Sequence, residues 1–141
     1  MAVRVRLRIE RNNRSVEVVA LVNSGYEADT PQLMIPIRIA QELGLWPPPP
    51  TVIEEVFDTA GGPLRVWIVR GSAEVYVVAG DTYSRRVRVD IVISPLADEV
   101  LISDVLAGEL EIAVEDFAKG YWRFRWEPKE RIRTSEKRTP I

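Results

Sequence analysis

The chain has 141 residues, a net charge of −2, and neither cysteine nor histidine. The missing residue types exclude disulfides, thiolate nucleophiles, Ser-His and Cys-His catalysis and the commonest metal ligands, and we expect no metal or cofactor. The charge is uneven, because residues 117–141 carry +5 and residues 1–116 carry −7.

Strands dominate the predicted secondary structure, since apolar residues mostly alternate with polar ones. Pro36 and Gly44 mark the start and end of one short helix, and Ser103 caps a second. Gly61 and Gly62 favour a hairpin tip. The predicted strands cover residues 3–9, 16–22, 30–35, 52–57, 64–69, 73–78, 86–93, 99–102, 112–114 and 121–126, and the helices cover residues 37–43 and 104–110. This pattern predicts an all-β domain with two short helices, over residues 1–120, closed into a small barrel-like sheet.

Residues 121–141 are predicted to form an aromatic and basic strand followed by a flexible tail from about residue 127. The alternation puts Trp122, Phe124 and Trp126 on one face. Such a face suits contacts between subunits, which we favour, or the stacking of single-stranded nucleic acid bases. The acidic body of the chain argues against nucleic acid as a partner.

Four segments in the first 116 residues carry a family resemblance. Asn23-Ser24-Gly25 follows the predicted strand 16–22, and residues 35–45 form a strand and helix that end in Leu-Gly-Leu. The Gly-Gly hairpin and the apolar segment 100–106 follow in order. Together they resemble the retroviral-type aspartic proteases, or retropepsins, whose catalytic Asp is replaced here by Asn23.

The resemblance implies an acid-protease fold with one lobe per subunit and a site on the axis of a homodimer. The family pattern places Asn23 at the catalytic position, Ser24 in a hydrogen bond across the axis, and Gly25 close to the substrate backbone. The flap would be formed by Ala60, Gly61 and Gly62. Glu27 and Asp29 would bind the main chain of a peptide or protein substrate, unless they form salt bridges with the abundant arginines.

Departures from the family pattern concern activity. Asn23 cannot exchange a proton near neutral pH, whereas the protease mechanism needs a coupled pair of carboxyl groups. Ile102 stands where the family prefers Gly, and Tyr26 where it usually has Ala. Asp58-Thr59-Ala60 resembles a second catalytic triplet, but no helix follows it. We expect an aspartic-type endopeptidase homologue that is inactive as given, or a non-catalytic peptide-binding module; Asn23 is compatible with a natural or an engineered replacement.

Two further expectations concern the setting of the protein. We expect a cytoplasmic location without membrane attachment, because no apolar segment approaches the length of a membrane span and no signal peptide is recognisable. Arg outnumbers Lys sixteen to three, and Asn, Gln and Met are few. We interpret this composition as a hint of a thermophilic source.

Overall fold

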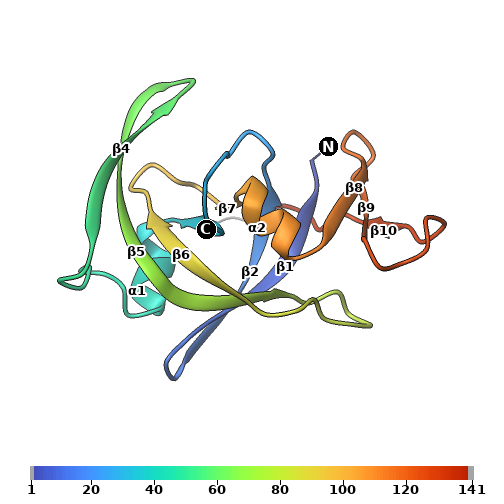
Figure 1. Cartoon of the computed structure of the whole chain (residues 1–141), viewed down its shortest axis with the longest axis horizontal. Helices are drawn as coiled ribbons and strands as arrows, with labels where there is room; N and C mark the ends of the chain where they lie inside the picture. Colours follow the sequence, from blue (N-terminus) through green and yellow to red (C-terminus); the bar gives the residue numbers. More distant parts are fainter. Residues whose placement is uncertain (1, 140–141) are drawn as a thin grey trace.

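The computed structural model describes residues 2–139 and consists mainly of β-strands with two short helices (Figure 1). The strands are β1 (Arg4–Arg11), β2 (Arg14–Val22), β3 (Gln32–Ile35), β4 (Ile53–Thr59), β5 (Gly62–Val77), β6 (Val87–Ile93), β7 (Val100–Ile102), β8 (Ile112–Asp116), β9 (Tyr121–Phe124) and β10 (Arg133–Thr134), and the helices are α1 (Ile37–Glu42) and α2 (Asp104–Glu109). The predicted all-β class with two short helices is confirmed.

Six strands close into a barrel in the order β1-β2-β7-β3-β6-β5, because β1 also pairs with β5. The alternation along β1 explains its place in the wall. Val5, Leu7 and Ile9 are buried in the main core, while the arginines between them point outward. The predicted barrel is therefore confirmed, and its interior is filled by the apolar face of each strand.

β5 is one strand of sixteen residues, although we predicted two strands at 64–69 and 73–78. Its pairing with β6 shifts register between Val69 and Ala73, and Gly71 there has a φ of 55°. Glycine adopts this conformation without strain, so the chain bulges and continues as the same strand. The second half of β5 then pairs with β1 and closes the barrel.

The first half of β5 forms a hairpin with β4, which projects away from the barrel (Figure 1). The tip is tight, because Thr59 pairs with Gly62, whose φ is 108°. β4 is the last strand of the sheet and has β5 as its neighbour. We call this hairpin, residues 53–69, the flap, a name that describes only its position at the edge of the sheet.

β7 lies between β2 and β3, parallel to β2 and antiparallel to β3. This arrangement brings the end of β2 beside the start of α2. α2 begins at Ser103, whose Oγ accepts a hydrogen bond from the N–H of Leu106 at 3.2 Å, which confirms the predicted cap. Neither helix exceeds six residues, and within residues 2–139 no helix is long and apolar enough to cross a membrane.

Candidate functional site

The turn that follows β2 is closed by the side chain of Asn23. Its Oδ1 accepts a hydrogen bond from the N–H of Gly25 at 3.0 Å, and its main-chain oxygen accepts one from Tyr26 at 3.1 Å. The N–H of Asn23 donates to the oxygen of Ile102 at 3.2 Å, which ties the turn to the end of β7. Asn23, Ser24 and Gly25 thus lie in a hydrogen-bonded turn at the surface of the barrel.

Asp104 holds the next part of this loop. Its N–H donates to the oxygen of Tyr26 at 2.8 Å, and its Oδ1 accepts from the N–H of Ala28 at 3.0 Å. The sequence analysis identified the apolar segment 100–106 and a helix that begins at residue 104. It did not predict that the side chain of Asp104 contacts the loop after β2. Its role depends on the crossing of α2 and the loop, which lie 76 residues apart in the chain.

The side chain of Tyr26 is buried against the apolar cluster next to the loop. Only 9% of the residue is exposed, and its hydroxyl donates to Oε1 of Gln32 at 2.9 Å. Burial raises the pKa of the Tyr26 phenol well above its usual range, so the hydroxyl stays protonated and remains a donor. The bulky residue thus supports the loop from below.

A groove of about 710 Å³ lies between this loop and the flap. Its floor is the surface of a second apolar cluster, in which Tyr26 and Met34 pack against Phe57, Leu64 and Leu101. The lining residues are Asn23, Gly25, Tyr26, Glu27, Met34, Val56, Phe57, Asp58, Thr59, Ala60, Leu64 and Leu101. Such an apolar depression with polar groups along it suits the binding of an organic ligand or peptide.

Half of the predicted site residues line this groove. Asn23, Gly25, Glu27 and Ala60 come together there, from the loop and from the flap tip. The others do not line it: Ser24 and Asp29 are exposed nearby on the loop, Gly61 lies in the turn of the hairpin, and Gly62 is the first residue of β5. The sequence analysis did not predict the apolar floor. One signal was present, because a two-residue turn after Thr59 places Phe57 opposite Leu64 in the hairpin.

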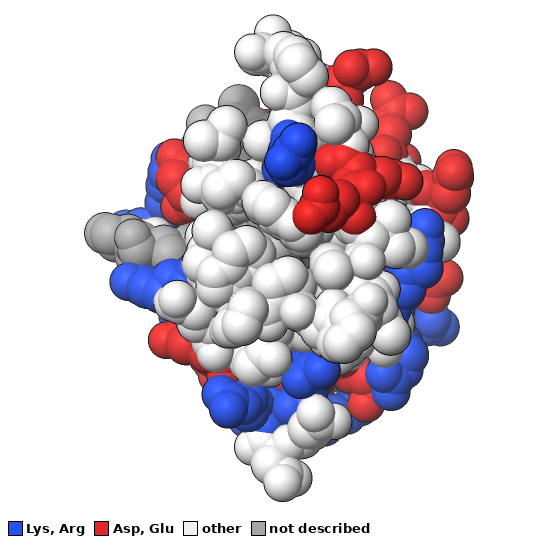
Figure 2. All heavy atoms as spheres, turned by 90° about the vertical axis from the view of Figure 1, so that its left-hand side faces the viewer, with Lys and Arg blue, Asp and Glu red and all other residues white. Residues whose placement is uncertain are grey.

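Two carboxylates are the charged side chains of the groove. Glu27 comes from the loop and Asp58 from β4, and both are exposed. In the part of the chain that the structure describes, Glu27, Asp29 and Asp58 form no salt bridge, so the ion-pair alternative raised for Glu27 and Asp29 is not seen. On the side of the molecule that carries β4, acidic side chains gather in the upper part, next to a broad uncharged surface (Figure 2).

The C-terminal aromatic face is not a free surface. Trp122 is 4% exposed and Phe124 is fully buried, and both belong to the main core of this chain. The predicted subunit contacts through these two residues are therefore wrong, and neither ring can stack with a nucleic acid base. Trp126 lies beyond β9 and is exposed, with its ring stacked on that of Phe124 at 5.1 Å between centroids.

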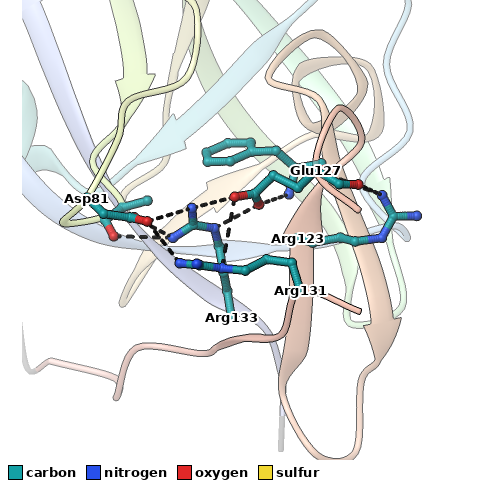
Figure 3. A network of polar contacts seen from close by, with 7 residues as sticks. Asp81, Arg123, Glu127, Arg131 and Arg133 are labelled. Atoms are coloured by element: carbon teal, nitrogen blue, oxygen red, sulfur yellow. Dashed lines mark hydrogen bonds and ion pairs between the residues drawn. The ribbon is translucent and has the colours of Figure 1, made fainter. Parts of the chain in front are cut away.

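The segment expected to be a flexible tail is packed against the barrel as far as β10, which pairs with β9. Arg133 is 8% exposed, and its guanidinium contacts Glu127 at 2.6 Å and Asp81 at 2.8 Å (Figure 3). Arg131 also contacts Asp81, at 2.9 Å. We call these four residues the C-terminal clasp. The prediction of a flexible tail from about residue 127 is therefore wrong for this segment. Ion pairs with Asp81, in a distant loop, hold the segment in place although it has few apolar residues.

The contacts of Arg133 change the pKa values of Glu127, Asp81 and Arg133 itself. The hydrogen bond from Arg133 holds the pKa of Glu127 below its ordinary value of 4.5, and it also lowers the pKa of Asp81. The same contact with Glu127 raises the pKa of Arg133 further above its usual range. The two clasp carboxylates thus pair with an arginine of the same chain, whereas the groove carboxylates form no ion pair within residues 2–139.

The groove supplies hydrogen-bonding groups and negative charge, but no proton relay at Asn23. An amide neither takes up nor releases a proton near neutral pH. Within residues 2–139, no three Asp or Glu side chains lie close enough to hold a metal ion. The chain matches no protein-family model and no curated protein sequence.

Proposed function

We propose that this chain is a homodimeric retropepsin-like protein that binds an extended peptide beneath the flap and does not cleave it. The observation that carries the proposal is the groove, because it joins the Asn23 turn to the flap over an apolar floor. The resemblance based on the sequence segments requires this same juxtaposition of turn and flap.

The flap favours an extended ligand. Within residues 2–139, β4 has its partner β5 on one side only, so its other edge offers unpaired main-chain N–H and C=O groups. Residues 56–59 of this strand also line the groove. A peptide in extended conformation can pair with such an edge and direct alternate side chains toward the apolar floor.

The identity of Asn23 explains why binding would not lead to hydrolysis. In the dimer that the resemblance implies, each subunit supplies one residue at this position, and two amides provide neither a general base nor a general acid. Ser24 and Gly25 are exposed in the single chain, which leaves them accessible to a second subunit. A cytoplasmic location and a thermophilic source stay predictions from the sequence.

The test compares the chain with its Asn23→Asp variant, using fluorescein-labelled casein between about pH 4 and 7, where a coupled carboxylate pair is active. Asn13→Asp, in the exposed turn between β1 and β2, is the matched control. We expect cleavage by Asn23→Asp alone, and sedimentation velocity should give a dimer for all three proteins. Equal cleavage by the unmodified chain would show that Asn23 is not at the catalytic position.

A further inference from the structure

The charged lining of the groove indicates what kind of peptide it takes. Glu27 and Asp58 are its charged members and both are acidic, while the remaining lining is apolar or neutral. A negative rim around an apolar floor attracts cations and repels anions, and this effect is strongest where few counter-charges are close.

Glu27 and Asp58 form no salt bridge within residues 2–139, although more than half of the acidic residues do. The chain contains sixteen arginines, and within residues 2–139 twelve of its 21 acidic residues contact a guanidinium. Glu99 contacts Arg4 at 2.9 Å and Asp90 contacts Arg70 at 3.3 Å, and Glu10 contacts Arg86. Glu27 and Asp58 thus carry charges that the fold does not use within residues 2–139.

We infer that the groove selects peptides with an apolar residue flanked by Lys or Arg, whose cationic groups pair with Glu27 and Asp58. This inference rests on the proposed peptide-binding function and specifies its ligand. The apolar residue would lie on the floor formed by Met34, Phe57 and Leu101. Glu27 belongs to the loop and Asp58 to the flap. The two carboxylates would therefore bind the cationic side chains on opposite sides of that apolar residue.

The experiment measures fluorescence anisotropy with three labelled octapeptides that share a Leu-Phe centre, flanked by Lys, Ser or Glu. Exposed ion pairs contribute up to about 1 kcal/mol each, or about fivefold in affinity, so two of them give up to about 25-fold. We expect the Lys peptide to bind the unmodified chain at least about tenfold more tightly than the Ser peptide, and the Glu peptide to bind most weakly. About 0.5 M salt should reduce the difference, because it screens exposed charges.

The variant Glu27→Gln with Asp58→Asn tests the two carboxylates directly. We expect it to bind the Lys and Ser peptides equally, with an unchanged affinity for the Ser peptide. The control, Glu74→Gln with Glu109→Gln, makes the same change in net charge at exposed positions outside the groove. It should keep the full preference for the Lys peptide.

Three results would overturn the inference, and they can be told apart. Equal binding of all three peptides by the unmodified chain would remove the charge selection and leave the peptide-binding proposal in place. Binding of none of them would contradict the proposed function itself. Loss of self-association in the Glu27→Gln with Asp58→Asn variant, by sedimentation velocity, with an unchanged peptide preference, would make a second copy of the chain the partner of these carboxylates.

Discussion

The groove and the C-terminal clasp use the same residue types in opposite ways. At the clasp, Asp81 and Glu127 converge on Arg133, which is almost completely buried (Figure 3). At the groove, Glu27 and Asp58 stay exposed and form no ion pair within the described chain. A carboxylate that pairs with a buried guanidinium stabilises the fold, whereas an exposed one without a partner is available to a ligand. Charge composition therefore indicates little until the pairing is known.

The strongest way to break this contrast is Arg133→Met, which removes the buried one of the two clasp arginines. Glu127 would keep its charge at a side chain that is only 8% exposed, and removing one member of a buried pair costs about 3 kcal/mol or more. We expect a loss of this size in the free energy of unfolding, measured with urea.

Arg85→Met is the matched control for this measurement. Its contact with Glu109 lies between side chains that are 56% and 41% exposed, so a loss of at most about 0.5 kcal/mol is expected. Equal losses in the two variants would show that the clasp contributes no more than an ordinary surface pair.

Acid should act on the clasp before it affects the packing of the barrel. The pKa of Glu127 is lowered in the folded protein, so its contribution to stability is present above the ordinary value of 4.5 and disappears as the pH falls through the folded pKa. We expect the melting temperature of the unmodified chain to decrease between about pH 5 and 3. Arg133→Met should show a smaller decrease over the same range, since it has already lost the contact. Parallel decreases in the two proteins would assign the acid sensitivity to other groups.

The smallest effect on stability is expected at the groove. Glu27→Gln with Asp58→Asn removes two exposed charges that form no ion pair, so the free energy of unfolding should change by no more than about 0.5 kcal/mol. Urea unfolding checks this value on the same preparation that is used for peptide binding. A loss comparable to that of Arg133→Met would mean that these carboxylates are structural.

Much of the fold was predictable from local patterns. Alternation in residues 3–9 and 16–22 predicted two strands, which the structure confirms as β1 and β2. Gly44, with a φ of 72°, ends α1 as predicted. These features depend on side-chain periodicity and on backbone conformations that few residue types allow, both of which are visible in a short stretch of sequence.

Other features were decided by contacts between distant segments. Asp81 and Arg133 lie 52 residues apart, and nothing near residue 133 indicates that a charged side chain there is buried. The floor of the groove likewise combines Met34, Phe57 and Leu101 from three different strands. Local composition made residues 127–139 look like a solvated tail, because it reports the polarity of a segment and not its partners.

The sequence by itself determined most of the strand pattern, the two helices, and the presence of an amide at the position where the resemblance places a catalytic carboxylate. Those properties are local, since they depend on residue identity and on spacings of a few residues. Only the tertiary structure decided which carboxylates pair with an arginine and which remain available in a groove. Pairing of charges depends on distances in space, and these are set by the closure of the barrel and by the crossing of β7 between β2 and β3.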